Sequence, residues 1–241
     1  MSQVFETKKI SPRKAAVIVG VSMIMIAICA GFAFGFAHSS LVIPTDAEAT
    51  VSQLLGNLPL FQAEIFSWFL ILVFDIIVAW ALYVFMKQID HHLALLGGWL
   101  RLSYAVILGI AISNLILISL LLRDPLDSSF AHTNQLTAQV TLYLNAFDRV
   151  WSLGLIVFGL HLLIIAYLIL KSDFIPKFLG ILLCIAALSY ILIHSMYLFL
   201  PQYETTTLLI EKILSLPMAV GELGFGLWLL IKGGKTTPKR N

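Results

Sequence analysis

One long apolar stretch decides the fold of this chain. Residues 65–86 read IFSWFLILVFDIIVAWALYVFM, with Asp75 as the single acidic side chain. A helix crosses the hydrocarbon core of a bilayer with about 20 apolar residues, so this stretch is long enough to span a membrane. Five further stretches share its length and character: residues 15–37, 102–122, 150–170, 178–200 and 208–231. The sequence therefore predicts six transmembrane helices.

The composition of the whole chain is that of a membrane protein. Of its 241 residues, 60% are hydrophobic and only 12% are charged, whereas a soluble domain carries roughly 25% charged residues. We therefore expect an all-α, polytopic membrane helix bundle whose partner is the lipid bilayer. The chain divides into a cytoplasmic N-terminal segment over 1–14, a six-helix transmembrane domain over 15–231 and a cytoplasmic C-terminal tail over 232–241.

The positive charges predict how the helices are oriented. Lys and Arg accumulate in the cytoplasmic loops of membrane proteins. Of the 15 Lys and Arg residues, all but Arg123, Arg149 and Lys212 fall on the side that would hold both termini. Arg101 is counted there, at the inner end of the third stretch. We expect a multi-pass protein of the cell membrane with both termini in the cytoplasm.

Charge and cysteine content exclude several kinds of partner. The net charge is only +2, and the basic residues lie at the ends of apolar stretches rather than in a patch, so we expect no nucleic acid partner. The two cysteines, Cys29 and Cys184, lie inside apolar stretches without the spacing of a metal site. The sequence contains no motif for a bound cofactor, and we expect none.

Several segments resemble a bacterial membrane family, the domain of unknown function 4386. The segments that carry the resemblance are WSLGLIVFGLHLL at 151–163, YLILKS at 167–172, IPKFLGILL at 175–183, Phe74-Asp75, Ala81–Tyr83, Leu95–Arg101, Gly221-Glu222 and Leu227–Gly233. The resemblance covers nearly the whole chain. It implies a compact multi-helix membrane domain and no particular reaction. We expect a small protein of a bacterial inner membrane.

Four polar side chains are expected to share one depth near the middle of the membrane. Counted from the charged inner ends of their helices, Asp75, Asn114, His161 and Glu222 all lie 10 to 13 residues deep, which is about 15–20 Å at 1.5 Å per residue. Ionisable side chains in the hydrocarbon are costly and usually face the bundle interior. The spacing therefore predicts a polar midplane layer built from four helices.

A second set of charges lies at the outer edge of the predicted bundle. Glu64, Arg149, Glu211 and Lys212 stand near the outer ends of their helices, where charged residues commonly act as interfacial anchors. Two ion pairs are expected there, Glu64 with Arg149 and Glu211 with Lys212. The outer connections over 38–64 and 123–149 are each long enough for a short interfacial helix.

Three functions are open for the midplane layer. The first is binding or passage of a small solute, cation or proton, with Asp75 and Glu222 as exchangeable carboxylates and His161 as a relay. The second is a structural or regulatory membrane partner without chemistry, because interhelical hydrogen bonds explain the same residues. The third is a metal-dependent intramembrane enzyme acting on a lipid, although no His-Glu-x-x-His motif occurs. The first is our expectation, and enzyme activity and metal binding stay open.

Overall fold

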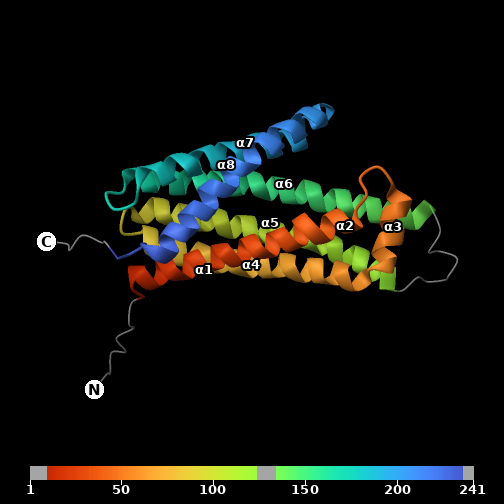
Figure 1. The fold of residues 1–241 in the computed structure, drawn as a ribbon, viewed down its shortest axis with the longest axis horizontal. Coiled ribbons are helices and arrows are strands. Elements are labelled where there is room, and N and C mark those ends of the chain that lie inside the picture. Colours follow the sequence, from red (N-terminus) through yellow and green to blue (C-terminus); the bar gives the residue numbers. More distant parts are fainter. Residues whose placement is uncertain (1–9, 124–133, 236–241) are drawn as a thin grey trace, which may run out of the picture.

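The computed structural model describes residues 10–123 and 134–235, which form a bundle of long helices (Figure 1). The elements are α1 (Pro12–Ala30), the π-helix η1 (Gly31–His38), α2 (Ser39–Leu41), α3 (Ala47–Gly56), α4 (Leu58–Met86), α5 (His91–Arg123), α6 (Asn134–Lys171), α7 (Lys177–Phe199), the 3₁₀ helix η3 (Pro201–Tyr203) and α8 (Glu204–Ile231). No strand occurs within these two described ranges. Six helical spans are long and apolar enough to cross a membrane, with α1, η1 and α2 making the first. The predicted all-α bundle with six membrane spans is confirmed.

Two of the spans extend well beyond the apolar stretches that predict them. The third is predicted over 102–122 and the fourth over 150–170, but α5 begins at His91 and α6 at Asn134. Hydropathy marks where a helix enters the hydrocarbon, whereas backbone hydrogen bonding continues into more polar sequence. Arg101 is therefore not at a helix end: it lies inside α5 and is 3% exposed.

The connections at the other end follow the expectation in part. The connection over 38–64 holds a short helix, α3. Residues 134–149 belong to α6 itself, so the second expected interfacial helix is the beginning of a membrane span. The segment 124–133, and with it part of the connection over 123–149, lies outside the described residues, as do 1–9 and 236–241 of the two terminal segments.

The six spans close into a ring in chain order. The first span packs on α4, α4 on α5, α5 on α6, α6 on α7, and α7 on α8, while α8 returns to α1. The short connections between α4 and α5 and between α6 and α7 make these pairs of helices antiparallel neighbours, and α6 and α7 are in extensive contact. Every span therefore contributes one side to a common interior.

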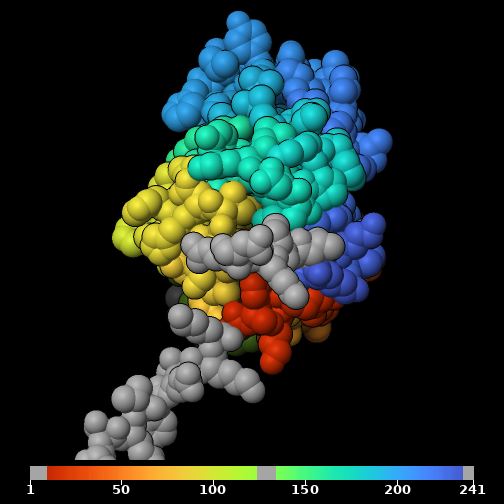
Figure 2. All heavy atoms as spheres, turned by 90° about the vertical axis from the view of Figure 1, so that its left-hand side faces the viewer, coloured from red at the N-terminus to blue at the C-terminus, as the bar shows by residue number. Residues whose placement is uncertain are grey.

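Both described chain ends meet at the same end of the bundle, which we call the terminal end. The guanidinium of Arg13 donates to the carbonyls of Leu229, Leu230 and Gly233 at 3.1, 2.7 and 2.9 Å, and so caps the C-terminus of α8. The space-filling view of this end shows α1, the beginning of α5, α7 and the end of α8 packed side by side (Figure 2).

An ion pair at the terminal end joins the last residue of α6 to the connection between α4 and α5. Lys171 Nζ donates to Asp90 Oδ2 at 2.8 Å. Hydrogen bonding from Lys171 holds the pKa of Asp90 below its usual value. The pair is exposed to solvent, so we expect it to contribute little to stability.

Glycines permit close helix contacts in the ring. A Cβ added at Gly159 on α6 would lie 2.7 Å from Ile191 Cγ1 and 2.9 Å from the Ala187 carbonyl on α7. A Cβ at Gly20 on α1 would lie 2.7 Å from Leu230 Cβ on α8. Toward the opposite end, which carries α3 and which we call the α3 end, α7 and α8 diverge from α6 (Figure 1).

Substitution of Gly159 tests the close contact between α6 and α7. We expect Gly159→Ala to lower the free energy of unfolding by about 1–3 kcal/mol, because the added methyl group overlaps backbone that cannot move freely. The matched control is Gly224→Ala on α8, where the nearest atom would be 3.8 Å away. Alanine favours a helix over glycine, so the control should be unchanged or more stable by up to about 1 kcal/mol. Thermal unfolding in detergent compares the stability of the two variants with that of the wild type. Equal changes in the unfolding temperature of the two variants would contradict the packing argument.

Candidate functional site

A buried guanidinium lies at the centre of the polar side chains in the bundle. Arg101 Nη2 donates to Asp75 Oδ1 at 2.6 Å, which joins α5 to α4. Its Nη1 lies 3.4 Å from His161 Nε2, which reaches from α6. All three side chains are buried, with Asp75 and His161 each 1% exposed. The sequence predicts Asp75 and His161 at one depth, and the structure links them through Arg101.

The second nitrogen of His161 fixes the form of its ring. His161 Nδ1 lies 2.8 Å from the backbone carbonyl of Gly97, one turn before Arg101 on α5. A carbonyl oxygen only accepts, so Nδ1 carries the proton and donates. Nε2 then keeps its lone pair and accepts from Arg101. His161 is therefore a neutral imidazole that accepts a hydrogen bond from Arg101 and donates one to the backbone of the helix that carries Arg101.

Glu222 is bonded separately from Asp75, Arg101 and His161. The Tyr190 hydroxyl on α7 donates to Glu222 Oε1 on α8 at 2.8 Å. The Tyr190 ring packs edge to face on Phe158 of α6, with centroids 5.2 Å apart, and the Arg101 guanidinium lies over the same Phe158 ring at 5.2 Å. The Phe158 ring thus lies between the Tyr190–Glu222 pair and the guanidinium of Arg101 and contacts both. We call these residues, Asp75, Arg101, His161, Tyr190 and Glu222, the polar layer.

Asn114 does not join the polar layer. Its side-chain amide donates to the carbonyls of Ile110 and Ala111 on its own helix. The expected depth was counted from Arg101 as a helix end, yet Arg101 is itself part of the layer. Thirteen residues separate the two along α5, and at 1.5 Å per residue this is about 20 Å. Asn114 therefore lies far toward the α3 end.

Part of the hydrogen-bonding capacity of the polar layer is unused. Asp75 Oδ2 and Arg101 Nε are buried and have no partner among the described residues. Buried polar atoms nearly always have a protein or water partner. The unused acceptor and donor belong to the two directly paired residues, so they present a complementary pair of hydrogen-bonding atoms.

The outer-edge charges are paired differently from the expectation. Glu64 is fully buried and bonds His38 Nδ1 of η1 at 2.8 Å, not Arg149. Glu211 accepts from the Tyr197 hydroxyl at 2.5 Å, not from Lys212. Sequence reasoning misses these partners because hydropathy indicates a loop at His38, whereas the helix of the first span continues through it. The buried carboxylate of Glu64 also needs a partner that is itself inside, which the exposed Arg149 is not.

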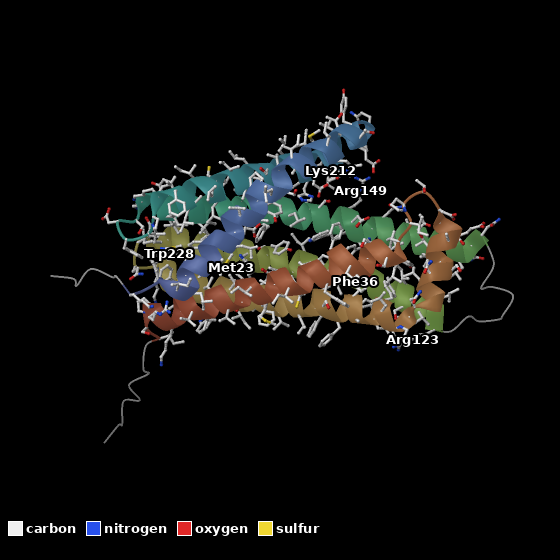
Figure 3. All side chains as sticks on the ribbon, viewed as in Figure 1. Met23, Phe36, Arg123, Arg149, Lys212 and Trp228 are labelled. Carbon is white, nitrogen blue, oxygen red and sulfur yellow. The ribbon has the colours of Figure 1, made fainter. Side chains whose placement is uncertain are left out.

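Arg149 faces a cavity between diverging helices. Its guanidinium donates to the Tyr197 backbone carbonyl on α7, and Figure 3 shows Arg149 on α6 near the part of α8 that carries Lys212. The cavity measures about 540 Å³ and is lined by η1, the segment from α2 into α3, α6, α7 and α8. Ser152 and His194, 3.3 Å apart, are among its lining residues.

The cavity comes within one residue contact of the polar layer. His194 lines the cavity, and its ring stacks on Tyr190 with centroids 6.0 Å apart and an interplanar angle of 17°. Tyr190 is bonded to Glu222. The path from the cavity to the Glu222 carboxyl group therefore runs through two aromatic rings on one face of α7.

Metal ligation has no geometric support in the described part of the chain. No three His, Cys, Asp or Glu side chains within residues 10–123 and 134–235 are close enough together to hold a metal ion. Cys29 and Cys184 are both free thiols. The chemistry that this arrangement can perform is hydrogen bonding, charge pairing and proton exchange.

Comparison with known proteins identifies the family. The model of the family described as Domain of unknown function (DUF4386) matches residues 18–233, which include every residue of the polar layer. The chain belongs to this family. An uncharacterized protein of Archaeoglobus fulgidus is 29% identical over 167 residues, which is 69% of this chain and 82% of that protein. No solved structure matches the chain.

The Asp75–Arg101 pair gives a test of how the polar layer is held together. Replacing one partner leaves the other charge buried, so Arg101→Met and Asp75→Leu should each lower the free energy of unfolding by about 3–5 kcal/mol. The double variant should lose much less free energy of unfolding than the two single variants lose together, because neither charge is then left buried without its partner. Chemical unfolding in detergent gives the free energy of unfolding of the wild type, the two single variants and the double variant. Asp90→Asn, which removes an exposed paired carboxylate, is the control and should change little. Additive losses would show that the two side chains do not interact.

Proposed function

We propose that this multi-pass protein lies in the cell membrane with both termini in the cytoplasm. The support is the distribution of positive charge over the two ends of the bundle. The terminal end and its connections carry Lys87, Lys171, Lys177 and Lys232, in addition to the partly buried Arg13. Arg123, Arg149 and Lys212 lie toward the α3 end. Positive charge accumulates on the cytoplasmic side, which makes the terminal end the inner one.

Reporter fusions test this orientation. A fusion at Asp90, in the connection between α4 and α5, should report a cytoplasmic location. Fusions at Asp46 and Gln202, on the opposite end of the bundle, should report an outside location, and a fusion at His132 should agree with them. An outside signal at Asp90 would reverse the orientation.

We propose further that the protein binds a small polar solute, or passes a proton, at the polar layer. The observation that carries this proposal is the unused hydrogen-bonding capacity of two buried groups, Asp75 Oδ2 and Arg101 Nε. A small molecule with one donor and one acceptor carries the two kinds of group that these atoms need. Water carries both kinds of group as well, and buried water commonly bonds polar groups that have no protein partner.

The charges in the polar layer favour a polar solute or a proton over a metal cation. Asp75 already has a cationic partner in Arg101, at 2.6 Å. His161 uses both ring nitrogens, one toward Gly97 and one toward Arg101. Glu222 is different, because its one hydrogen bond within the described residues comes from the neutral Tyr190 hydroxyl. Glu222 is therefore the carboxyl group that we assign to proton exchange.

Proton flux into liposomes tests the role of Glu222. The protein is reconstituted into liposomes that contain a pH-sensitive dye, and valinomycin with an outward potassium gradient drives protons inward. The wild-type protein should acidify the lumen faster than protein-free liposomes. Glu222→Gln should remove this excess, because glutamine keeps an acceptor for Tyr190 but carries no proton to exchange.

The control for this experiment is Asp90→Asn, which removes an exposed carboxyl group outside the membrane spans and should retain full flux. If wild-type flux equals that of empty liposomes, solute binding remains to be tested by thermal unfolding with polar solutes at several pH values. Proteins with Asp75→Asn and Glu222→Gln are compared there with the wild type. Identical responses of all three would leave no role for the polar layer beyond structure.

A structural role is the second candidate, and one observation favours it. Asp75, Arg101 and His161 come from three successive helices. Arg101 contacts both of the others, so the three side chains fix how α4, α5 and α6 pack. Interhelical hydrogen bonds in membranes contribute about 0.6–2 kcal/mol each. On this account the protein serves as a structural or regulatory membrane partner, and the flux and solute-binding experiments both give negative results.

A further inference from the structure

The cavity at the α3 end is separate from the polar layer and has its own chemistry. About 540 Å³ is the size of a site for an organic molecule rather than for a single ion. Its walls come from η1 and the residues after it on one side and from α6, α7 and α8 on the other. Toward this end, α7 and α8 diverge from α6 (Figure 1).

The charged groups around the cavity are mostly acidic. Three carboxylates, Asp148, Glu204 and Glu211, line it against one guanidinium, Arg149. Arg149 already donates to the Tyr197 carbonyl. His38 also lines the cavity, but it is paired with the buried carboxylate of Glu64, so this pair is balanced within itself. The cavity therefore has an excess of negative charge.

Aromatic and imidazole rings complete the wall. Phe34 and Trp151 pack edge to face with centroids 5.4 Å apart, and both line the cavity with Tyr197. Ring faces attract organic cations. His194 is 7% exposed and lines the same space, and its Nε2 has no hydrogen bond among the described residues. A deeply buried polar side chain with a free ring nitrogen thus remains available to a ligand.

We propose that this cavity binds an organic ammonium group. Carboxylates that are spread around an aromatic wall neutralise a large, diffuse cation, whereas a metal ion needs several ligands within about 2–3 Å. No group of three acidic, imidazole or thiol side chains in the described residues is close enough together for a metal ion. The geometry thus suits an alkylated or primary amine and disfavours calcium or magnesium.

The ammonium group has two chemical sources, a free amine and the headgroup of a lipid or other amphiphile. The cavity walls include Val42, Ile43 and Leu208, from the two sides that diverge. An alkyl chain attached to the ammonium group would lie against these side chains. A free amine needs only the charged and aromatic part, so a short and a long probe distinguish the two sources.

Calorimetric titration of the purified protein tests the proposal. The protein is kept in dodecyl maltoside, which contains no amine, and is titrated with choline and separately with dodecyltrimethylammonium, with empty micelles subtracted. We expect saturable binding of at least one probe. The double variant Asp148→Asn/Glu211→Gln should weaken it by about tenfold or more, since 1.4 kcal/mol corresponds to a factor of ten. The substituted amide at position 211 keeps an oxygen that can accept from Tyr197, so the fold should be kept.

The matched control is Glu48→Gln, which removes an exposed carboxylate of α3 that does not line the cavity and should leave binding unchanged. Binding of both probes supports a free amine, and binding of dodecyltrimethylammonium alone supports an amphiphile. Absence of saturable binding of either probe overturns the proposal. So does equal binding by the wild type and the double variant, or displacement of the bound probe by millimolar calcium. Because Glu222 is untouched, proton flux of the double variant is expected to equal that of the wild type, which separates this site from the polar layer.

Discussion

The buried guanidinium of Arg101 is the constraint on which the interior of this bundle depends. A charge within the hydrocarbon region is costly unless it faces the bundle interior and has a partner. Arg101 meets both conditions through Asp75 on the preceding helix and His161 on the following one. The three helices cannot rotate independently without separating these groups. The rotation of each helix about its axis is therefore fixed by the Arg101–Asp75 ion pair and by the hydrogen bond from Arg101 to His161.

Close packing at one end and divergence at the other explain where open space occurs. Small residues let α1 approach α8 and let α6 approach α7, and Arg13 ties the end of α8 to the beginning of α1. Toward the α3 end, α7 and α8 leave α6, and the space between is lined by charged and aromatic side chains. The resulting cavity lies at the α3 end, while Asp75, Arg101 and His161 of the polar layer are buried.

The polar layer and the cavity differ in charge, which separates their chemistry. In the layer, the positive charge of Arg101 offsets Asp75, and Glu222 is bonded to a neutral hydroxyl. Around the cavity, three carboxylates face a single guanidinium. The first arrangement suits a neutral polar molecule or a proton, and the second suits a cation. The two sites adjoin, because His194 of the cavity wall stacks on Tyr190 of the polar layer.

The sequence alone determined the class of this protein and much of its interior. Long apolar stretches require a membrane because a chain of this size cannot bury them otherwise, and the few ionisable residues within them must face inward, as Asp75 and His161 do. Depth counting could not assign Arg101, because hydropathy cannot distinguish a basic residue at the membrane surface from one paired inside. The partnerships of Arg101 with Asp75 and of His38 with Glu64 join residues 26 positions apart on different helices. Only tertiary packing decides such contacts, since helix rotation and divergence are properties of the whole ring and not of any one segment.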